Sequence, residues 1–240
     1  MEFLEIVRQW IDGQIAFYEN RIAQQRARYQ RENLRWTEEE ARNSRNRIDE
    51  LRTLRDHIGR AIMLRRRHGN DVLVLANIVW NEAADYGWNA KVAVAYAWLN
   101  RTGNVVREPV GSEISHFVPL LTRWNSLSEG EKLSFLRTFP DSVNAAQQRF
   151  AERLPVLDDP TNRATHWVSP IGLPAFSNQP NRYRRTVGRA RDKAFPNWAR
   201  ATDDPEVARM QRRGSLAANF AEITADGVAR EEFLFYTGVR

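Results

Sequence analysis

The stretch "DVLVLANIVWNEAADYGWNAKVAVAYAWLNR", from Asp71 to Arg101, places a short polar segment between two strongly apolar ones. The segments "DVLVLANIVW" and "KVAVAYAWL" are apolar on nearly every side, and their length and alanine content favour helices over strands. The intervening "ADYG" is a turn signal. We therefore predict two buried helices that form the centre of a mainly helical domain.

A single glutamate, Glu82, lies where the first of these helices ends. If that helix covers residues 72–81, Ile78 and Val79 lie one turn before Glu82, and its carboxyl group emerges on a buried face. Aromatic residues crowd the same junction: Trp80, Tyr86 and Trp88. Ionising a carboxyl group in such surroundings is costly, so it can keep its proton near neutral pH and act as a general acid in glycoside cleavage. The structural alternative is that Glu82 caps a helix or pairs with Arg101 or Lys91.

Composition limits the classes of function. A chain of 240 residues can form one large domain, or a medium domain with an appendage. The net charge of +6 favours an anionic partner, such as nucleic acid, acidic lipid or the polyanionic polymers of a bacterial wall. Arginine outnumbers lysine 33 to 3, which we attribute to genome composition rather than recognition. No stretch approaches the ~20 apolar residues that a membrane span needs.

Several chemistries are excluded by what the sequence lacks. The chain has no cysteine, so it has no disulfide framework, zinc ribbon or thiol nucleophile. Phosphate-cradling glycine loops, the H-E-x-x-H metal motif and the G-x-S-x-G nucleophile motif are also missing. The histidines are too scattered to suggest a metal site: His57, His68, His116 and His166. We expect neither a metal nor a cofactor.

Residues 1–69 are predicted to form an N-terminal amphipathic helical hairpin for targeting or interaction. Apolar residues at helical spacing define a first seam (Leu4, Ile11, Ile15, Tyr18, Ile22, Tyr29 and Trp36) and a second (Ile48, Leu51, Leu54, Ile58 and Ile62). Thr37 and Glu40 match a capping box that begins the second helix. The first seam thins after Ile22, which argues against a long coiled coil. The basic run 64–69 is interpreted as a solvated helix end.

Residues 70–240 are predicted to form the second domain. Ser128 with Glu131 predicts the start of a covering helix, Asp141 the cap of another, and Asp204 with Pro205 the start of a third within 203–223. The segment "ATHWV" at 164–168 is predicted to be a short strand, with "FLFY" at 233–236 as its partner. Residues 175–205, rich in Pro, Asn and Arg, are predicted to be an ordered surface loop.

Two motifs carry a resemblance to a known family. "NIVWNEAADYGWNAKVAVAYAWLNR", followed after about sixty residues by "DDPTNRATHWVSP", resembles the spore-cortex-lytic cell-wall hydrolases of the SleB type. That family has an E-A motif with A-V-A and L-N-R, and later a D-P-T motif followed by a histidine or tyrosine and an aromatic residue. The resemblance covers roughly residues 73–236. The chain has Asn81 and Asn162 where the family usually has glycine.

The resemblance implies a lysozyme-like helical domain with a small β-hairpin, within the lysozyme and lytic transglycosylase superfamily. It also implies that Glu82 is the catalytic glutamate of a peptidoglycan-cleaving glycosidase, either a muramidase or a lytic transglycosylase. The residues expected to bind glycan strands are Tyr86, Trp88, Asp159, Thr165, His166 and Trp167. The candidates for a second catalytic carboxylate are Asp85 and Asp159, although turn formation is an alternative role for each. A lytic transglycosylase needs no second carboxylate.

The alternative hypothesis is a basic helical binding or adaptor protein that carries an inactive hydrolase-like domain. Salt-sensitive binding to an anionic polymer without glycan cleavage would favour it. The N-terminus has no signal-peptide pattern. A wall hydrolase made in the cytoplasm would then reach the cell wall as a phage lysin or as a secreted antibacterial effector. Its partners would include peptidoglycan, a secretion-machine component or an immunity protein, but no specific nucleic acid.

Overall fold

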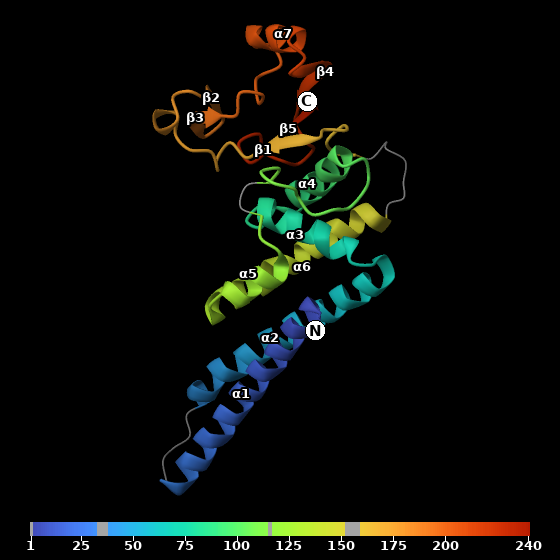
Figure 1. Cartoon of the computed structure of the whole chain (residues 1–240). Coiled ribbons are helices and arrows are strands. Elements are labelled where there is room, and N and C mark those ends of the chain that lie inside the picture. Colours follow the sequence, from blue (N-terminus) through green and yellow to red (C-terminus); the bar gives the residue numbers. More distant parts are fainter. Residues whose placement is uncertain (1, 33–37, 115–116, 152–158) are drawn as a thin grey trace. The chain divides into compact units, whose positions relative to one another are not determined.

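The computed structural model describes the whole chain except residues 1, 33–37, 115–116 and 152–158 (Figure 1). Its described residues are mainly helical and include small antiparallel sheets, which confirms the predicted fold class in its coarse form. The chain divides into two compact units. One unit comprises Met1–Gly69 and Val118–Pro140, and the other comprises Asn70–Phe117 and Asp141–Arg240. Residues 118–140 therefore belong to the unit of the N-terminal hairpin, although the sequence analysis assigned them to the second domain.

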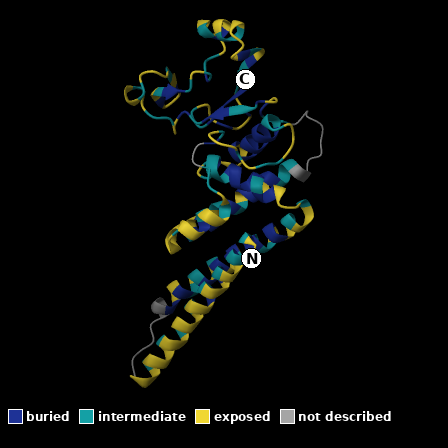
Figure 2. Ribbon diagram, in the orientation of Figure 1, coloured by how far each residue is buried: buried dark blue, intermediate teal, exposed yellow. Residues whose placement is uncertain are grey.

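The first unit is built on two long helices, α1 (Phe3–Arg31) and α2 (Glu38–His68), which lie against each other (Figure 1). All five residues of the predicted second seam are buried: Ile48, Leu51, Leu54, Ile58 and Ile62. The first seam is buried at Leu4, Ile11 and Ile15 and partly exposed at Tyr18, Ile22 and Tyr29, while Trp36 lies outside the described residues (Figure 2). The predicted cap formed by Thr37 and Glu40 lies outside the described residues.

Aromatic packing joins residues 118–140 to α1. Helix α5 (Leu120–Ser126) carries the buried Trp124, whose ring centre lies 6.3 Å from that of Phe3. Phe135 and Phe139 stack at 4.8 Å, and the ring of Phe3 meets both edge-on at 6.2 and 6.0 Å. The sequence analysis missed this cluster because the three segments are far apart in the chain.

Helix α6 runs without interruption over Glu129–Ala151. The predicted capping box is confirmed, because the Glu131 carboxylate accepts hydrogen bonds from the Ser128 backbone N–H at 2.8 Å and hydroxyl at 2.6 Å. The prediction that Asp141 caps a separate helix is wrong. Proline lacks the N–H donor for one helical hydrogen bond. Helix α6 nevertheless continues through Pro140, because apolar side chains beyond it are buried and their packing favours the helix.

Helices α3 (Asp71–Ala83) and α4 (Trp88–Arg101) form the centre of the second unit and confirm the two predicted buried helices. Every residue of α4 from Ala90 to Leu99 is buried. The buried ammonium group of Lys91 donates hydrogen bonds to the carbonyls of Ala84 and Tyr86, in the turn between the helices. Burial lowers the pKa of Lys91. The Lys91 side chain thus fixes the turn that follows Glu82.

A three-stranded antiparallel sheet completes this unit, with the order β1 (His166–Val168), β5 (Leu234–Val239), β4 (Leu216–Ile223). Trp167 is paired with Phe235 in the register of β1 and β5. The predicted strand and its predicted partner are therefore confirmed. A core cluster packs on this sheet and includes Val168, Phe195, Leu216, Phe220, Leu234 and Tyr236.

One prediction for the C-terminal region is wrong. Residues 175–205 are not only loop, because they contain a short 3₁₀ helix, η2 (Phe176–Asn178), and a hairpin of β2 (Tyr183–Val187) and β3 (Ala190–Phe195). Gly188, at a φ of +53°, allows the tight turn between the strands. The predicted start of the next helix is confirmed, because α7 (Pro205–Arg212) begins after the Asp204 cap. Gly214, at a φ of +76°, ends this segment before β4.

Candidate active site

Glu82 lies in the last turn of α3, partly buried, and its carboxylate faces β1. The indole N–H of Trp167 donates a hydrogen bond of 2.8 Å to Glu82 Oε2. This contact joins residues that are 85 positions apart in the sequence. The glutamate at the helix end is therefore oriented by the strand that carries the second sequence motif.

Glu82 and Trp167 both line an open cavity of about 780 Å³ within the second unit. The lining comes from the end of α3, from Arg101 at the end of α4, from residues 112–114, and from β1 with the loop that follows it. Arg182 and residues 196–198, which follow β3, also line the cavity. Ligand sites in proteins commonly have volumes of ~300–1,000 Å³, so the cavity has room for a small ligand or for part of a polymer.

A buried tryptophan packs against the cavity-lining residue Trp167. Trp98, on α4, is fully buried, and its ring meets that of Trp167 nearly edge-on at 6.4 Å between centres. The guanidinium groups of Arg107 and Arg101 lie 5.4 and 6.0 Å from the centre of the Trp98 ring. Such cation–π contacts hold arginine side chains in place. Trp98 therefore contacts both Trp167 and the two arginines, Arg101 and Arg107.

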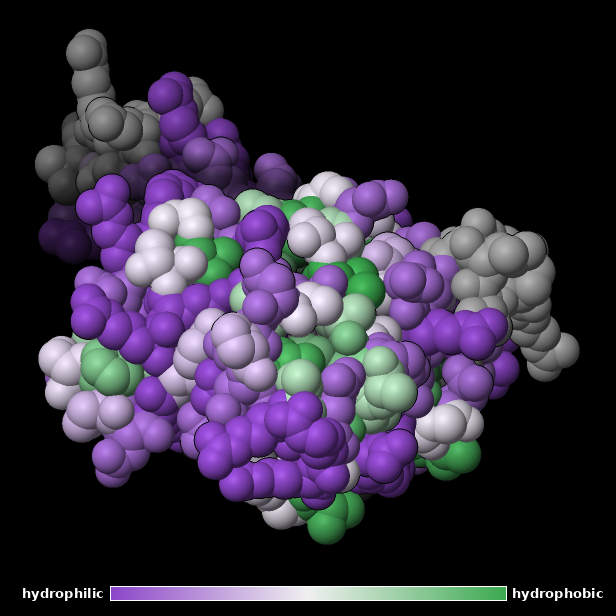
Figure 3. All heavy atoms as spheres, turned by 90° about the horizontal axis from the view of Figure 1, so that it is seen from above, coloured by the Kyte–Doolittle hydropathy of each residue, from purple (hydrophilic) through white to green (hydrophobic). Residues whose placement is uncertain are grey.

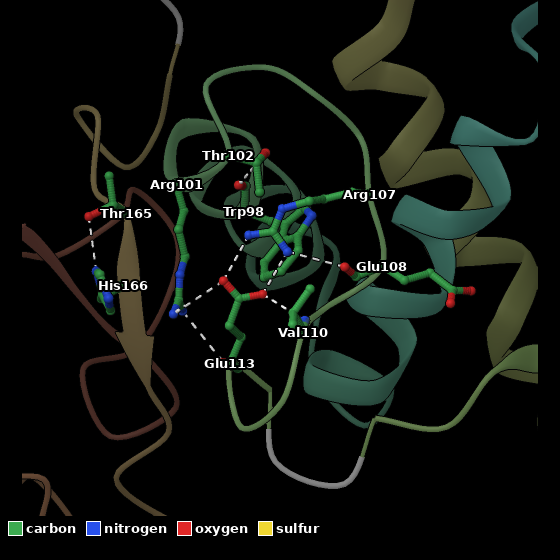
Figure 4. A network of polar contacts seen from close by, with 9 residues as sticks. All are labelled: Trp98, Arg101, Thr102, Arg107, Glu108, Val110, Glu113, Thr165 and His166. Atoms are coloured by element: carbon green, nitrogen blue, oxygen red, sulfur yellow. Dashed lines mark hydrogen bonds and ion pairs between the residues drawn. The ribbon is translucent and has the colours of Figure 1, made fainter.

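Another part of the cavity lining is built around Glu113, which was not among the predicted site residues (Figure 4). The Arg107 guanidinium donates to both oxygens of the Glu113 carboxylate, at 2.7 and 2.8 Å, and the Val110 backbone N–H adds a third bond of 2.8 Å. These bonds lower the pKa of Glu113 to about 2. Glu113 is therefore an ionised carboxylate that holds residues 107–113 in a compact loop. Arg101 lies 4.0 Å away in an ion pair, its side chain 22% exposed.

His166, on β1, faces the same cavity (Figure 4). Its ring lies 5.4 Å from that of Trp198 and its Nδ1 shares a hydrogen bond of 3.0 Å with the Thr165 hydroxyl. Burial, together with the positive charge of Arg101, lowers the pKa of His166 to about 4. The imidazole is consequently neutral at pH 5 and above, and it can exchange neutral hydrogen bonds with a ligand.

Tyr86 joins the cavity from the turn after α3. Its hydroxyl forms a hydrogen bond of 2.7 Å with the Ser169 hydroxyl, and its ring packs against Phe233 at 4.7 Å between centres. Of the residues predicted to bind glycan, Tyr86, His166 and Trp167 therefore lie together with Glu82. Thr165 reaches this group only through its bond to His166.

Asp159 has a different environment. Its carboxylate accepts hydrogen bonds from the Thr161 backbone N–H (2.8 Å) and hydroxyl (2.6 Å), from the Arg163 N–H (2.9 Å) and from the Asn100 amide (2.7 Å). These bonds fold residues 159–164 into a turn attached to α4. Asn162 has a φ of +46° there, in the left-handed region that favours glycine or asparagine. Asparagine tolerates this conformation better than most other residues that carry a side chain.

Two further candidates lie apart from the residues that the structure places around this cavity. The Asp85 side chain is exposed and is not among the lining residues. Trp88 is 45% exposed and lines a second, smaller cavity. No group of three or more His, Asp or Glu side chains that could hold a metal occurs among the described residues. Within the same part of the chain, no helix has the length and apolar character to cross a membrane.

Sequence reasoning missed several lining residues: Glu113, Ser169, Arg182 and Trp198. None belongs to an apolar pattern, and each comes from a loop or turn whose path depends on tertiary contacts. Comparisons with known proteins found no matching family model, no matching curated protein and no matching solved structure.

Proposed function

We propose that this chain cleaves the glycan strands of peptidoglycan, as a muramidase or a lytic transglycosylase, with Glu82 as general acid and then base. The observation that carries the proposal is the position of the Glu82 carboxyl group. It faces an open cavity of about 780 Å³ and is oriented by the Trp167 indole. One carboxyl group at the wall of a polar and aromatic cavity matches the needs of glycoside cleavage.

In the proposed reaction, Glu82 donates its proton to the glycosidic oxygen while the bond from that oxygen to C1 of the muramyl sugar breaks. Positive charge develops at C1 and the ring. The resulting carboxylate then takes a proton from the attacking group. In a lytic transglycosylase this group is the C6 hydroxyl of the same sugar, which yields a 1,6-anhydro product. In a muramidase it is water, which yields a reducing sugar.

The cavity favours the single-glutamate route. Glu113 is the other carboxylate among the described lining residues, and its oxygens already accept bonds from Arg107 and Val110. The bonds that Glu113 accepts lower its pKa to about 2, so its carboxylate is a weak base at neutral pH. Asp159 is likewise committed to its turn. We therefore propose the 1,6-anhydro product as the main one.

The rest of the lining suits a sugar polymer. Neutral His166 and the paired hydroxyls of Tyr86 and Ser169 offer hydrogen bonds to hydroxyl and acetamido groups. The Arg101 guanidinium offers a positive charge to a carboxylate of the peptide stem. The face of the molecule drawn in Figure 3 is mostly hydrophilic, with hydrophobic residues visible in small areas. These features support a hydrated, polar substrate rather than a lipid.

We also propose that the second unit has a lysozyme-like fold. A helix that ends in the catalytic glutamate, a second buried helix and a small antiparallel sheet beside the cavity support this assignment. The sheet supplies Trp167 and His166, and the helix supplies Glu82.

Mass spectrometry of purified sacculi, incubated with the full chain, tests the function. Release of 1,6-anhydro muropeptides supports the lytic transglycosylase route, and release of reducing muropeptides supports hydrolysis. Intact sacculi that bind the protein in a salt-sensitive manner would instead support the alternative, an inactive hydrolase-like domain in a basic adaptor protein.

A further inference from the structure

A second cavity lies in the same unit, and none of its described lining residues is among those of the cavity of Glu82. Its volume is about 330 Å³. It is formed by the first turns of α4, by Gln148 near the end of α6, and by Pro160 and the turn at Asp226 and Gly227. These segments are distant in sequence, so the cavity is a product of the folded unit.

Trp88 lines this cavity, and 45% of its surface is exposed. An indole ring is usually more fully buried, and an exposed aromatic ring beside a cavity is a feature of ligand sites. The flat apolar face of an indole matches the C–H face of a pyranose ring. Val92 and Tyr96, one and two turns further along α4, line the cavity as well.

The polar groups of the cavity are suited to a neutral ligand. Asn89 and Gln148 carry amides, which both donate and accept hydrogen bonds, and Asp226 carries a carboxylate, which accepts them from hydroxyl groups. No arginine, lysine or histidine is among the described lining residues. The described lining residues thus include one carboxylate and no cation, which disfavours phosphate or another anion and favours hydroxyl and acetamido groups.

The wall of the cavity depends on a glycine. Gly227 has a φ of +69°, and a Cβ atom at this position would come within 2.0 Å of Asn89 Nδ2. The Asn89 amide therefore occupies space that only glycine leaves open. On the other side, the Arg149 guanidinium lies 4.9 Å from the centre of the Tyr96 ring and donates a hydrogen bond of 2.7 Å to Asn104 Oδ1. The lining side chains are thus held in place.

We infer that this cavity is a second saccharide-binding site, which takes a neutral N-acetylated sugar stacked on Trp88. The inference rests on the proposed function, because a glycan polymer presents many such sugars. The site would hold peptidoglycan by a sugar that is not being cleaved. It would thereby raise the affinity of the chain for intact sacculi.

The test uses the full chain with the Glu82→Gln substitution, so that cleavage does not interfere. Binding to sacculi is measured by pelleting, with and without Trp88→Ala. The expected result is an affinity about 10-fold weaker for the Trp88 variant, in line with the loss of one aromatic contact. Phe17→Ala, which removes another exposed aromatic ring (57% exposed), is the matched control and should leave the affinity unchanged.

A second measurement needs no substitution at the site. A soluble tetramer of N-acetylglucosamine, titrated into the same protein, should shift the NMR signals of the Trp88 indole and the Asn89 amide. Unshifted signals, or equal affinity of the Trp88→Ala and Phe17→Ala proteins for sacculi, would overturn the inference. A wild-type protein that cleaves no glycan would refute the proposed function instead, and these binding measurements would still decide the second site.

Discussion

The Trp167 indole N–H donates to Glu82 Oε2 at 2.8 Å, and this bond connects the two motifs that are separated by 85 positions in the sequence. Trp167 is held on its other side by the buried Trp98 and by strand β5. The orientation of the Glu82 carboxyl group therefore depends on the packing of α4 and of the sheet.

Trp167→Phe removes the donor and keeps an aromatic ring. We expect kcat on peptidoglycan to fall about 10-fold, because a hydrogen bond to a charged group contributes ~1.5–3 kcal/mol and part of this is recovered by water. KM should change little, since the substitution alters the position of the acid rather than the binding of sugar. Steady-state kinetics on soluble glycan strands measures both constants.

Trp10→Phe, in the first unit, is the control for this experiment and should leave kcat unchanged. If Trp167→Phe raised KM and left kcat unchanged, Trp167 would be a binding residue rather than a positioning residue for Glu82.

His166 is predicted to be neutral at pH 5 and above. Its pKa is lowered to about 4 by burial and by Arg101, whereas an unfolded histidine titrates near 6.5. Between these values the unfolded chain binds more protons, so the contribution of His166 to stability is lost as the pH falls from 6.5 to 4. An NMR titration of the His166 imidazole measures this pKa. A midpoint above pH 6 would contradict the lowering of the pKa by burial.

Glu113→Gln tests how much the Glu113 carboxylate stabilises the loop of residues 107–113. The carboxylate holds Arg107 and the Val110 N–H, and its side chain is 22% exposed, so we expect a loss of stability of about 1–2 kcal/mol after allowance for solvent screening. The pKa of Glu113 is depressed to about 2, so its stabilising effect is present above ~4.5 and is lost as the pH falls toward 2.

Chemical denaturation of Glu113→Gln at pH 7 and at pH 2.5 measures this dependence. The difference from wild type should be largest at neutral pH and should shrink in acid. Glu108→Gln, an exposed carboxylate in the same loop, provides the matched control and should have little effect at either pH.

Asp159→Ala separates a structural role from a catalytic one. The Asp159 carboxylate accepts four hydrogen bonds within its turn, so its loss should cost about 2–3 kcal/mol of unfolding free energy. At a temperature where the variant remains folded, kcat should stay within about two-fold of wild type. A loss of kcat of a hundred-fold or more in the folded variant would restore Asp159 as a second catalytic carboxylate.

The helical framework of this chain could be read from its sequence because local patterns determine it. The two apolar segments around Glu82 became α3 and α4, and the capping residues Ser128 and Asp204 mark helix starts as predicted. The strand at 166–168 and its partner were also found, because alternating residues between turn signals leave few other structures.

The errors arose where tertiary packing overrides local signals. Asp141 was read as a cap, but α6 passes through Pro140 without ending. The arginine-rich segment at 183–195 forms a hairpin that composition alone did not indicate. In the candidate site, Glu113 was missed because its role depends on its ion pair with Arg107 and on a place in the cavity lining, and no local sequence pattern indicates either.

The most direct test of the proposed function is the release of muropeptides from sacculi by three proteins: wild type, Glu82→Gln and Asp85→Asn. Asp85 is an exposed carboxylate three residues beyond Glu82, and so it controls for the loss of a negative charge at the same helix end. We predict that wild type and Asp85→Asn release muropeptides at similar rates and that Glu82→Gln, with an unchanged circular dichroism spectrum, releases none. Release by folded Glu82→Gln at the wild-type rate would contradict the role assigned to this glutamate.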